Sequence, residues 1–267
     1  MAQLTQQSPK PIPNPPKTLS QLLSWKPPLY NDIIGWGVLP QNQMMVLYGE
    51  EETWKSWMAL EAVWSVSLGS PNGWLGFPVV QHRVMVLNTE ITEAMYQERA
   101  KVMSQSRGPL ENNAFFVTDL DRKIDTARGI NDTITELKSC KAELFILDDL
   151  YRAVMGNLAQ GPDVNRLIDS LNKIRKEAGV AILIIHHSRQ ADHDGTGRLV
   201  RLGTSEMYGA SFLKDHFDTI FSVTKGKEVM PGLESITIEP QKQRLASFKL
   251  PTRKWLVRRK DMRFLIA

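Results

Sequence analysis

A lysine and a serine stand side by side six residues after a glycine, in the run Gly49-Glu50-Glu51-Glu52-Thr53-Trp54-Lys55-Ser56. The glycine follows an apolar run at 44–48, and the serine begins a segment with helical periodicity. A loop of this length between a strand and a helix can turn its backbone N–H groups toward a phosphate, at the positive end of the helix. Lys55 can then contact the β- and γ-phosphates, and the Ser56 hydroxyl can bind Mg²⁺. The eight residues therefore predict a binding site for ATP and Mg²⁺.

Two features of this loop leave ATP hydrolysis open. In the usual pattern G-x-x-x-x-G-K-[ST] the residue before the lysine is glycine, but here it is Trp54. A residue with a Cβ atom has fewer backbone angles available at that position. Glu50, Glu51 and Glu52 also place negative charge beside a polyanion, although exposed carboxylates can point away and be screened by salt. The alternative role for Trp54 is packing on one face of the helix.

An aspartate ends a second apolar run, Leu144-Phe145-Ile146-Leu147-Asp148. In a parallel sheet the carboxyl ends of the strands face the ligand crevice, so Asp148 can hold Mg²⁺ through water or through Ser56. Asp149 follows directly, and the spacing alone does not decide which acid acts. The alternative is an ordinary acid that caps a helix.

Polar side chains also follow two further apolar runs. Glu90 comes just after the run at 84–88, where a carboxylate can orient and deprotonate an attacking water. His186 and His187 end the run that begins at residue 182, where a histidine can sense the γ-phosphate through a hydrogen bond. The alternative for the histidines is a purely structural role. These positions predict catalytic roles for Glu90, His186 and His187.

The elements that must position these residues alternate along the chain. We expect strands at 44–48, 84–88, 114–118, 144–148, 181–186 and 219–223, and helices at 55–68, 92–104, 126–139 and 163–178. Continuously apolar strands are typical of burial on both faces, which indicates a mainly parallel sheet with helices on each side. After residue 219 the helical pattern ends, and we expect antiparallel strands at 234–239, 244–250 and 253–258. The predicted fold class is α/β with a C-terminal antiparallel β extension.

The two ends of the chain differ from its middle. Residues 1–17 are polar and rich in proline, which favours a disordered tail. Residues 18–43 contain a short capped helix at 18–25 and a linker, and we expect the helix to dock on the main domain or on a neighbouring subunit. Residues 253–263 carry six basic side chains against one acid. Such a cluster can bind a phosphate backbone or protect an exposed edge strand, and the sequence leaves both open.

Composition limits the class of protein. The 267 residues can bury one large core, and 42% hydrophobic and 23% charged residues are ordinary for a globular protein. We find no apolar run near the roughly 18–20 residues that span a bilayer and no secretory signal, so we expect no membrane partner and a cytoplasmic location. The single cysteine, Cys140, excludes a disulfide framework and a cysteine-based zinc site.

This set of motifs resembles the RecA-like ATPases related to the RepA-type and DnaB-type hexameric replicative helicases. The resemblance covers about residues 18–258. The run Lys55-Ser56-Trp57-Met58-Ala59-Leu60 is similar to the helix start of several members, and some of these ATPases have an aromatic residue in place of the second loop glycine. The segments at 88–93 and 146–152 look like those of the catalytic glutamate and the metal-binding acid, which implies these roles for Glu90 and Asp148.

The resemblance extends to the histidine strand and to contacts between subunits. His186-His187-Ser188-Arg189 is similar to a segment of the RepA-type members, although Gln190 departs from their usual basic residue. Lys242 and Arg244 are similar to the pair with which DnaB-type helicases reach a neighbour's nucleotide. The alternative for that pair is a basic hairpin exposed to solvent.

The resemblance further implies a channel for single-stranded DNA. The channel loops of the family correspond to residues 152–163 and 188–208, and the second loop carries Arg189, Arg198 and Arg201 as candidate DNA-binding residues. A merely solvated loop is the alternative. The implied protein is a homo-oligomeric, hexameric helicase of DNA replication, with the ATPase domain at 44–267. Two further functions stay open: a DNA-binding loader or recombination mediator that does not unwind, and an ATP-binding regulatory protein that hydrolyses weakly.

Overall fold

The computed structural model describes residues 16–26, 31–110, 112–188, 207–209, 213–246 and 248–267. The chain divides into two compact units, Met1–Tyr30 and Asn31–Ala267. In the first unit, α1 (Leu19–Ser24) begins with a capping box. The Thr18 hydroxyl accepts a hydrogen bond from the Gln21 N–H, and the Gln21 side chain accepts one from the Thr18 N–H. The helix predicted at 18–25 is therefore present, while its docking stays a prediction.

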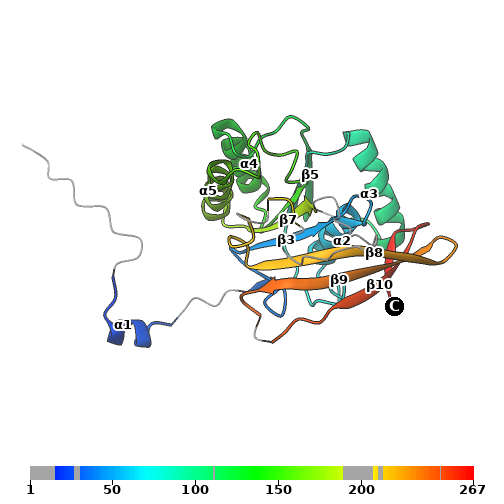
Figure 1. Cartoon of the computed structure of the whole chain (residues 1–267), viewed down its shortest axis with the longest axis horizontal. Coiled ribbons are helices and arrows are strands. Elements are labelled where there is room, and N and C mark those ends of the chain that lie inside the picture. Colours follow the sequence, from blue (N-terminus) through cyan, green and yellow to red (C-terminus); the bar gives the residue numbers. More distant parts are fainter. Residues whose placement is uncertain (1–15, 27–30, 111, 189–206, 210–212, 247) are drawn as a thin grey trace, which may run out of the picture. The chain divides into compact units, whose positions relative to one another are not determined.

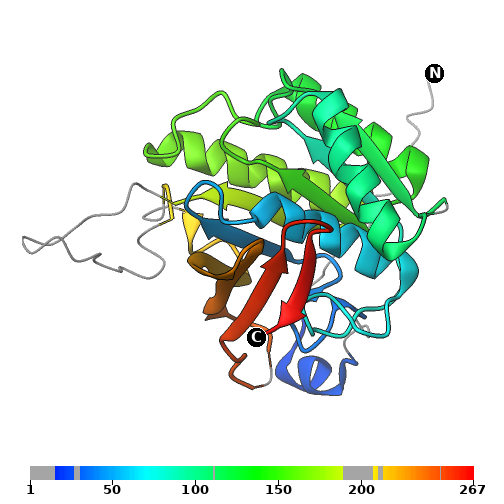
Figure 2. The same ribbon diagram turned by 90° about the vertical axis from the view of Figure 1, so that its right-hand side faces the viewer.

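In the described residues of the second unit, a nine-stranded sheet forms the centre (Figure 1). Its order is β11-β10-β9-β8-β3-β7-β6-β4-β5. The parallel part consists of β3 (Met44–Gly49), β4 (Val84–Asn88), β5 (Ala114–Thr118), β6 (Leu144–Asp148) and β7 (Ala181–His187), with β8 (Thr219–Met230) parallel to β3. The antiparallel part continues from β8 through β9 (Leu233–Gln243), β10 (Arg253–Arg258) and β11 (Arg263–Ile266), orange to red in Figure 2. A small separate sheet pairs β1 (Asp32–Ile34) with β2 (Leu39–Pro40). The predicted α/β class with its antiparallel extension is confirmed.

Helices cover both faces of the parallel strands. The helices are α2 (Lys55–Leu68), α3 (Glu93–Arg107), α4 (Ala127–Cys140) and α5 (Gly161–Ala178). On β3, Met45 and Leu47 enter the core that contains α2 and α3, whereas Met44 and Val46 enter the core that contains α4 and α5. This alternation explains the continuously apolar strands, because successive side chains point to opposite faces. No helix in the described part of the chain is long and apolar enough to cross a membrane.

The antiparallel extension differs from the prediction in three places, one of which is β11, a strand that was not predicted. The strand expected at 244–250 is wrong, since the described residues there form a loop. The Gln243 side chain accepts a hydrogen bond from the Leu250 N–H at 2.7 Å and donates one to the Phe248 carbonyl at 3.1 Å. These backbone groups therefore bond to a side chain instead of to a neighbouring strand. In addition, β8 continues past the predicted end at residue 223 and forms a long hairpin with β9. Its outer half is exposed, and the polar run from Lys225 to Glu228 interrupts the apolar pattern there.

The register of the parallel strands aligns the predicted site residues at one edge of the sheet. Gly49 at the end of β3 pairs with His187 at the end of β7, and Asn88 at the end of β4 pairs with Asp148 at the end of β6. Four carboxyl-terminal strand ends therefore lie next to one another. This is where a ligand binds in open α/β sheets.

Candidate functional site

The loop over residues 49–56 encloses the side chain of its own lysine. The Lys55 ammonium donates hydrogen bonds to the carbonyls of Gly49 at 3.0 Å and Glu50 at 2.5 Å, and to the Thr53 hydroxyl at 3.1 Å. Burial lowers the pKa of Lys55 to about 8, although the charges of nearby carboxylates, Asp148 first, oppose this shift. The lysine thus has a strong preference for an additional anion, because an anion would offset the cost of burying its charge.

Trp54 adopts the backbone conformation that a glycine would supply. Its φ of 69° and ψ of 12° lie in the left-handed region, immediately before α2 begins at Lys55. A side chain with a Cβ is uncommon in this region. The indole N–H of Trp54 donates a hydrogen bond of 3.0 Å to the carboxylate of Glu234 on β9. From the sequence we expect a Cβ at this position to restrict the backbone. The structure shows that the tryptophan does not prevent the glycine-like turn.

Ser56 and Asp148 form the pair of oxygen donors expected for a magnesium site. The hydroxyl of Ser56 on α2 donates a hydrogen bond of 3.1 Å to a carboxylate oxygen of Asp148 at the end of β6. Asp148 is 1% exposed, and burial together with the charges of Glu90 and Asp149 raises its pKa to about 7. A hard divalent cation prefers such oxygen ligands and would relieve this unfavourable burial. The donor set fits Mg²⁺.

The second acid, Asp149, faces a histidine. Its carboxylate lies 2.7 Å from His187 Nε2 and accepts a hydrogen bond of 3.0 Å from the Arg152 N–H. Burial opposes ionisation of Asp149, but the hydrogen bonds from His187 and Arg152 lower its pKa below the ordinary value. The peptide bond between Asp148 and Asp149 is cis. The structure thus gives different partners to two acids that the sequence left equivalent.

The two histidines also lie in different surroundings. His187 is partly exposed at the end of β7, next to Asp149. His186 is fully buried, and its Nε2 lies 2.9 Å from the Tyr208 carbonyl. Burial lowers the pKa of His186 to about 4, which keeps this imidazole neutral. Only His187 is in a position to contact a ligand bound over the loop, as far as the described residues show.

The end of β4 presents Glu90 to the same site. The Asn88 side chain accepts hydrogen bonds of 3.2 Å from the backbone N–H groups of both Glu90 and Ile91, and its amide donates to the Ile91 carbonyl at 2.6 Å. This turn ends the strand before Thr92 caps α3. The hydrogen bonds to its backbone therefore hold Glu90 close to Asp148. The negative charge of Glu90 raises the pKa of Asp148.

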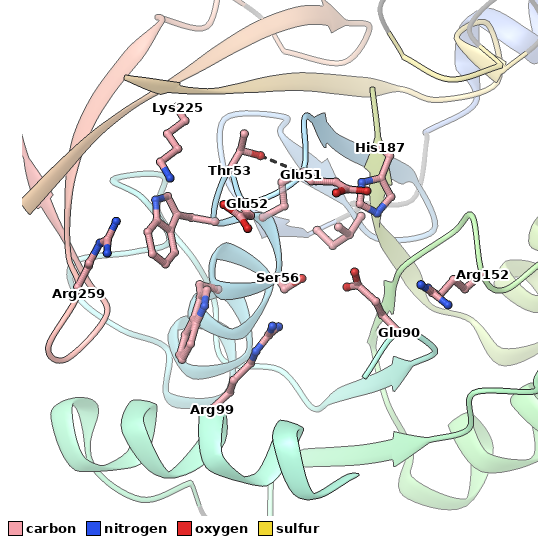
Figure 3. Close-up of a pocket in the computed structure, with 14 residues that line it drawn as sticks. Glu51, Glu52, Thr53, Ser56, Glu90, Arg99, Arg152, His187, Lys225 and Arg259 are labelled. Atoms are coloured by element: carbon pink, nitrogen blue, oxygen red, sulfur yellow. Dashed lines mark hydrogen bonds between the residues drawn. The ribbon is translucent and has the colours of Figure 1, made fainter. Parts of the chain in front are cut away.

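A cavity of about 560 Å³ opens over the loop (Figure 3). Its volume is in the range of small-molecule sites. In Figure 3, Ser56, Glu90 and His187 face this space, and Arg99 and Arg152 lie on two sides of Glu90. The lining residues are Glu51, Glu52, Thr53, Trp54, Lys55, Ser56, Trp57, Glu90, Arg99, Arg152, Ile185, His187, Lys225 and Arg259. The predicted phosphate loop and the predicted catalytic glutamate thus share one cavity.

Four basic residues of this cavity were not predicted as part of the site. Arg99 lies on α3 with its guanidinium 5.6 Å from the Trp57 ring centre, and Arg152 follows the end of β6. These two could have been found, since each follows a predicted strand-end acid. Lys225 and Arg259 come from the antiparallel extension, and no local pattern connects them with the loop.

The remaining predicted residues lie elsewhere. Lys242 pairs with Ile220 near the start of β8, at the end of the strands opposite to the cavity. Its ammonium donates to the Lys214 carbonyl at 2.7 Å, and the Arg244 guanidinium lies 3.3 Å from the Asp218 carboxylate. A role in ATP hydrolysis would need a neighbouring subunit and stays a prediction. The predicted DNA-binding residues lie outside the described residues: Arg189, Arg198 and Arg201.

The comparisons with known proteins agree with this geometry. A family model described as an AAA domain matches residues 8–193. The matched range contains the loop at 49–56 and the strand-end residues from Glu90 to His187. A search of curated proteins found no match.

Proposed function

The chain belongs to the AAA domain family of ATP-binding P-loop proteins, and we propose that it is an ATP-hydrolysing ring motor that acts on single-stranded DNA. The observation that carries the proposal is the convergence of Lys55, Ser56 and Glu90 on one cavity, with the buried Asp148 hydrogen-bonded to Ser56 beside it. Phosphoryl transfer depends mainly on positioning and on neutralising charge. A lysine for the phosphates, a metal-binding oxygen pair and a carboxylate for the attacking water are the parts that this chemistry needs.

Each residue has a distinct role in the proposed hydrolysis. Lys55 binds the β- and γ-phosphates. To do so, its ammonium gives up its hydrogen bonds to the carbonyls of Gly49 and Glu50. Ser56 and Asp148 hold Mg²⁺, which neutralises charge on the phosphates when it is bound. Glu90 accepts the proton of the attacking water. Arg99 has no hydrogen-bond or ion-pair partner among the described residues, so its guanidinium is free to bind a phosphate oxygen.

A second cavity supports the proposed contact with single-stranded DNA. It has a volume of about 540 Å³ and contains both aromatic and basic side chains, among them Tyr151, Tyr208, Lys123 and Arg152. The rings of Tyr151 and Tyr208 are 5.7 Å apart, and Tyr151 is 55% exposed. Exposed aromatic rings stack on bases, and basic groups track the phosphate backbone. Glu90 lines this cavity as well as the first, which offers a short route from DNA binding to hydrolysis.

ATP turnover measured with and without single-stranded DNA tests the proposal. We expect turnover that rises with DNA and falls by about a hundredfold or more in Lys55→Ala, because the phosphates lose their main cation. Turnover that does not depend on Lys55 would contradict the motor, and the weakly hydrolysing regulatory protein would then be favoured. A forked duplex distinguishes a helicase from a loader: if DNA stimulates hydrolysis but the strands never separate, the helicase function fails.

A further inference from the structure

A buried glutamate of the antiparallel extension contacts the phosphate loop at Trp54. Glu234 on β9 is 2% exposed, and its carboxylate accepts the indole hydrogen bond of Trp54. The Lys225 ammonium lies 3.3 Å from the same carboxylate, and Arg259 forms an ion pair with it. Burial opposes ionisation of Glu234, but hydrogen bonds from Arg259, Lys225 and Trp54 lower its pKa below the ordinary value. A charged acceptor is therefore fixed behind the loop.

The two cations also contact the indole ring itself. Lys225 Nζ lies 5.7 Å and Arg259 Cζ 5.9 Å from the ring centre of Trp54. Both distances are within the range of cation–π attraction. We call these four residues (Trp54, Lys225, Glu234 and Arg259) the Trp54 clamp. The β8–β9 hairpin and the turn after β10 are both far from the loop in sequence, and both contact it at Trp54.

The clamp acts where the loop is strained. A left-handed conformation is sterically unfavourable for a residue with a Cβ, and glycine avoids this cost. The backbone N–H groups of the loop must point inward to bind phosphate, so a loop that leaves this conformation loses its ligand. A chain with tryptophan at this position therefore needs tertiary contacts that hold the turn.

We propose that Glu234 is a positioning residue for the phosphate loop, which through the Trp54 indole maintains the backbone conformation that a glycine would adopt unaided. The inference rests on the proposed nucleotide-binding function. Glu234 is not among the residues that line the cavity, so its influence must pass through Trp54 or through the two cations. These two routes predict different results when Trp54 is changed.

A double-mutant cycle with a non-hydrolysable ATP analogue separates the routes. By calorimetric titration, Glu234→Leu should weaken binding about tenfold or more, the effect of losing a hydrogen bond to a charged group. In a Trp54→Gly background the same change should weaken binding less than about twofold, because glycine needs no clamp. Equal weakening in both backgrounds would overturn the proposal in favour of the cations. No weakening in either background would overturn it as well.

Two further measurements test the proposal in cases where the double-mutant cycle fails. The first applies if Glu234→Leu does not fold, and the second applies if the unchanged chain binds no nucleotide. Trp54→Phe keeps a bulky residue in the strained conformation but removes the N–H, so it should weaken binding as Glu234→Leu does. Unchanged affinity contradicts the clamp.

The emission of Trp54 without nucleotide is the second measurement. It is obtained by subtracting the spectrum of the matching Trp54→Phe protein, and it should shift to longer wavelength in Glu234→Leu. An unshifted spectrum contradicts the clamp, whereas absent nucleotide binding by the unchanged chain contradicts only the proposed function.

Discussion

At the scale of single residues, the site separates side chains that are alike in type. Asp148 contacts Ser56 and has its pKa raised to about 7 by burial, while Asp149 contacts His187 and has its pKa lowered. An acid that is costly to ionise gains most from a bound cation, and an acid that is already paired gains little. This difference supports Asp148 as the metal-binding residue and Asp149 as the residue that orients His187.

Glu90→Gln tests the proposed role in activating water. The amide keeps the size of the side chain but cannot accept a proton, so we expect turnover to fall by about 10²–10⁴-fold. Affinity for ATP should change little, because Glu90 would act in the transition state rather than in binding. The measurement is steady-state turnover together with equilibrium binding of ATP. A variant that binds ATP much more weakly yet turns over normally at saturation would assign Glu90 to substrate binding instead.

Tyr151→Ala tests the second cavity as a DNA site. Loss of a stacking ring should weaken binding of single-stranded DNA by about 1–3 kcal/mol, and Tyr151→Phe should retain most of the affinity because it keeps the ring. Fluorescence anisotropy with a labelled oligonucleotide gives both values. If alanine and phenylalanine behave alike, the ring does not stack on a base, and the basic segment at 253–263 becomes the next candidate.

At the scale of elements, the close approach of β3 and β8 fixes where the phosphate loop begins. A Cβ added at Gly49 would lie 2.4 Å from the Val223 carbonyl on β8 and 3.1 Å from the Thr53 hydroxyl. The glycine is therefore required by its neighbours, since it ends β3 without a positive φ. The same packing joins the loop to the antiparallel extension, which supplies Lys225 and Glu234.

Gly49→Ala should consequently disturb both stability and the loop. We expect the free energy of unfolding to fall by about 1–3 kcal/mol, as for other overpacked sites, with a loss of nucleotide affinity. Urea unfolding and calorimetric titration measure the two effects. Full stability and full affinity would mean that β8 moves away from β3 at no cost.

At the scale of the whole molecule, one subunit contains the cavity and places Lys242 and Arg244 at the opposite end of β8 and β9. A ring of identical subunits is a closed arrangement in which one end of each subunit meets the other end of its neighbour. In such a ring this basic pair would complete the next subunit's site. The hexamer and this contact both stay proposals.

Mixing two inactive proteins tests the shared site. Lys55→Ala removes the loop cation and Arg244→Ala removes the cation that we expect to act across the interface. In mixed rings some interfaces combine an intact loop with an intact Arg244, so part of the turnover should return. The measurement is ATP turnover of the mixture against each variant alone. Mixed rings, verified by differently tagged subunits, that show no recovery would place Arg244 outside the reaction.

The sequence by itself determined the order of the parallel strands and of the helices between them, and the residues at the ends of those strands. Continuous apolar runs predicted the bounds of β4, β5 and β6. For β4 and β6 the reason is burial on both faces, which leaves a local pattern. The positions of Lys55, Asp148 and Glu90 followed from the same pattern, since each lies at or just after the end of such a run. Local periodicity did not reveal β1, β2 or β11, nor the exposed outer half of β8, and it wrongly predicted a strand at 244–250.

Tertiary structure alone decided how this loop can bind phosphate. Its left-handed turn at Trp54 is held by Glu234, 180 residues away, and Arg259 joins from the turn after β10. The division of roles between Asp148 and Asp149, and between His186 and His187, likewise depends on which neighbour each side chain meets. Such contacts join segments that are far apart in sequence, and burial then sets their charge, so no pattern within a single segment can predict them.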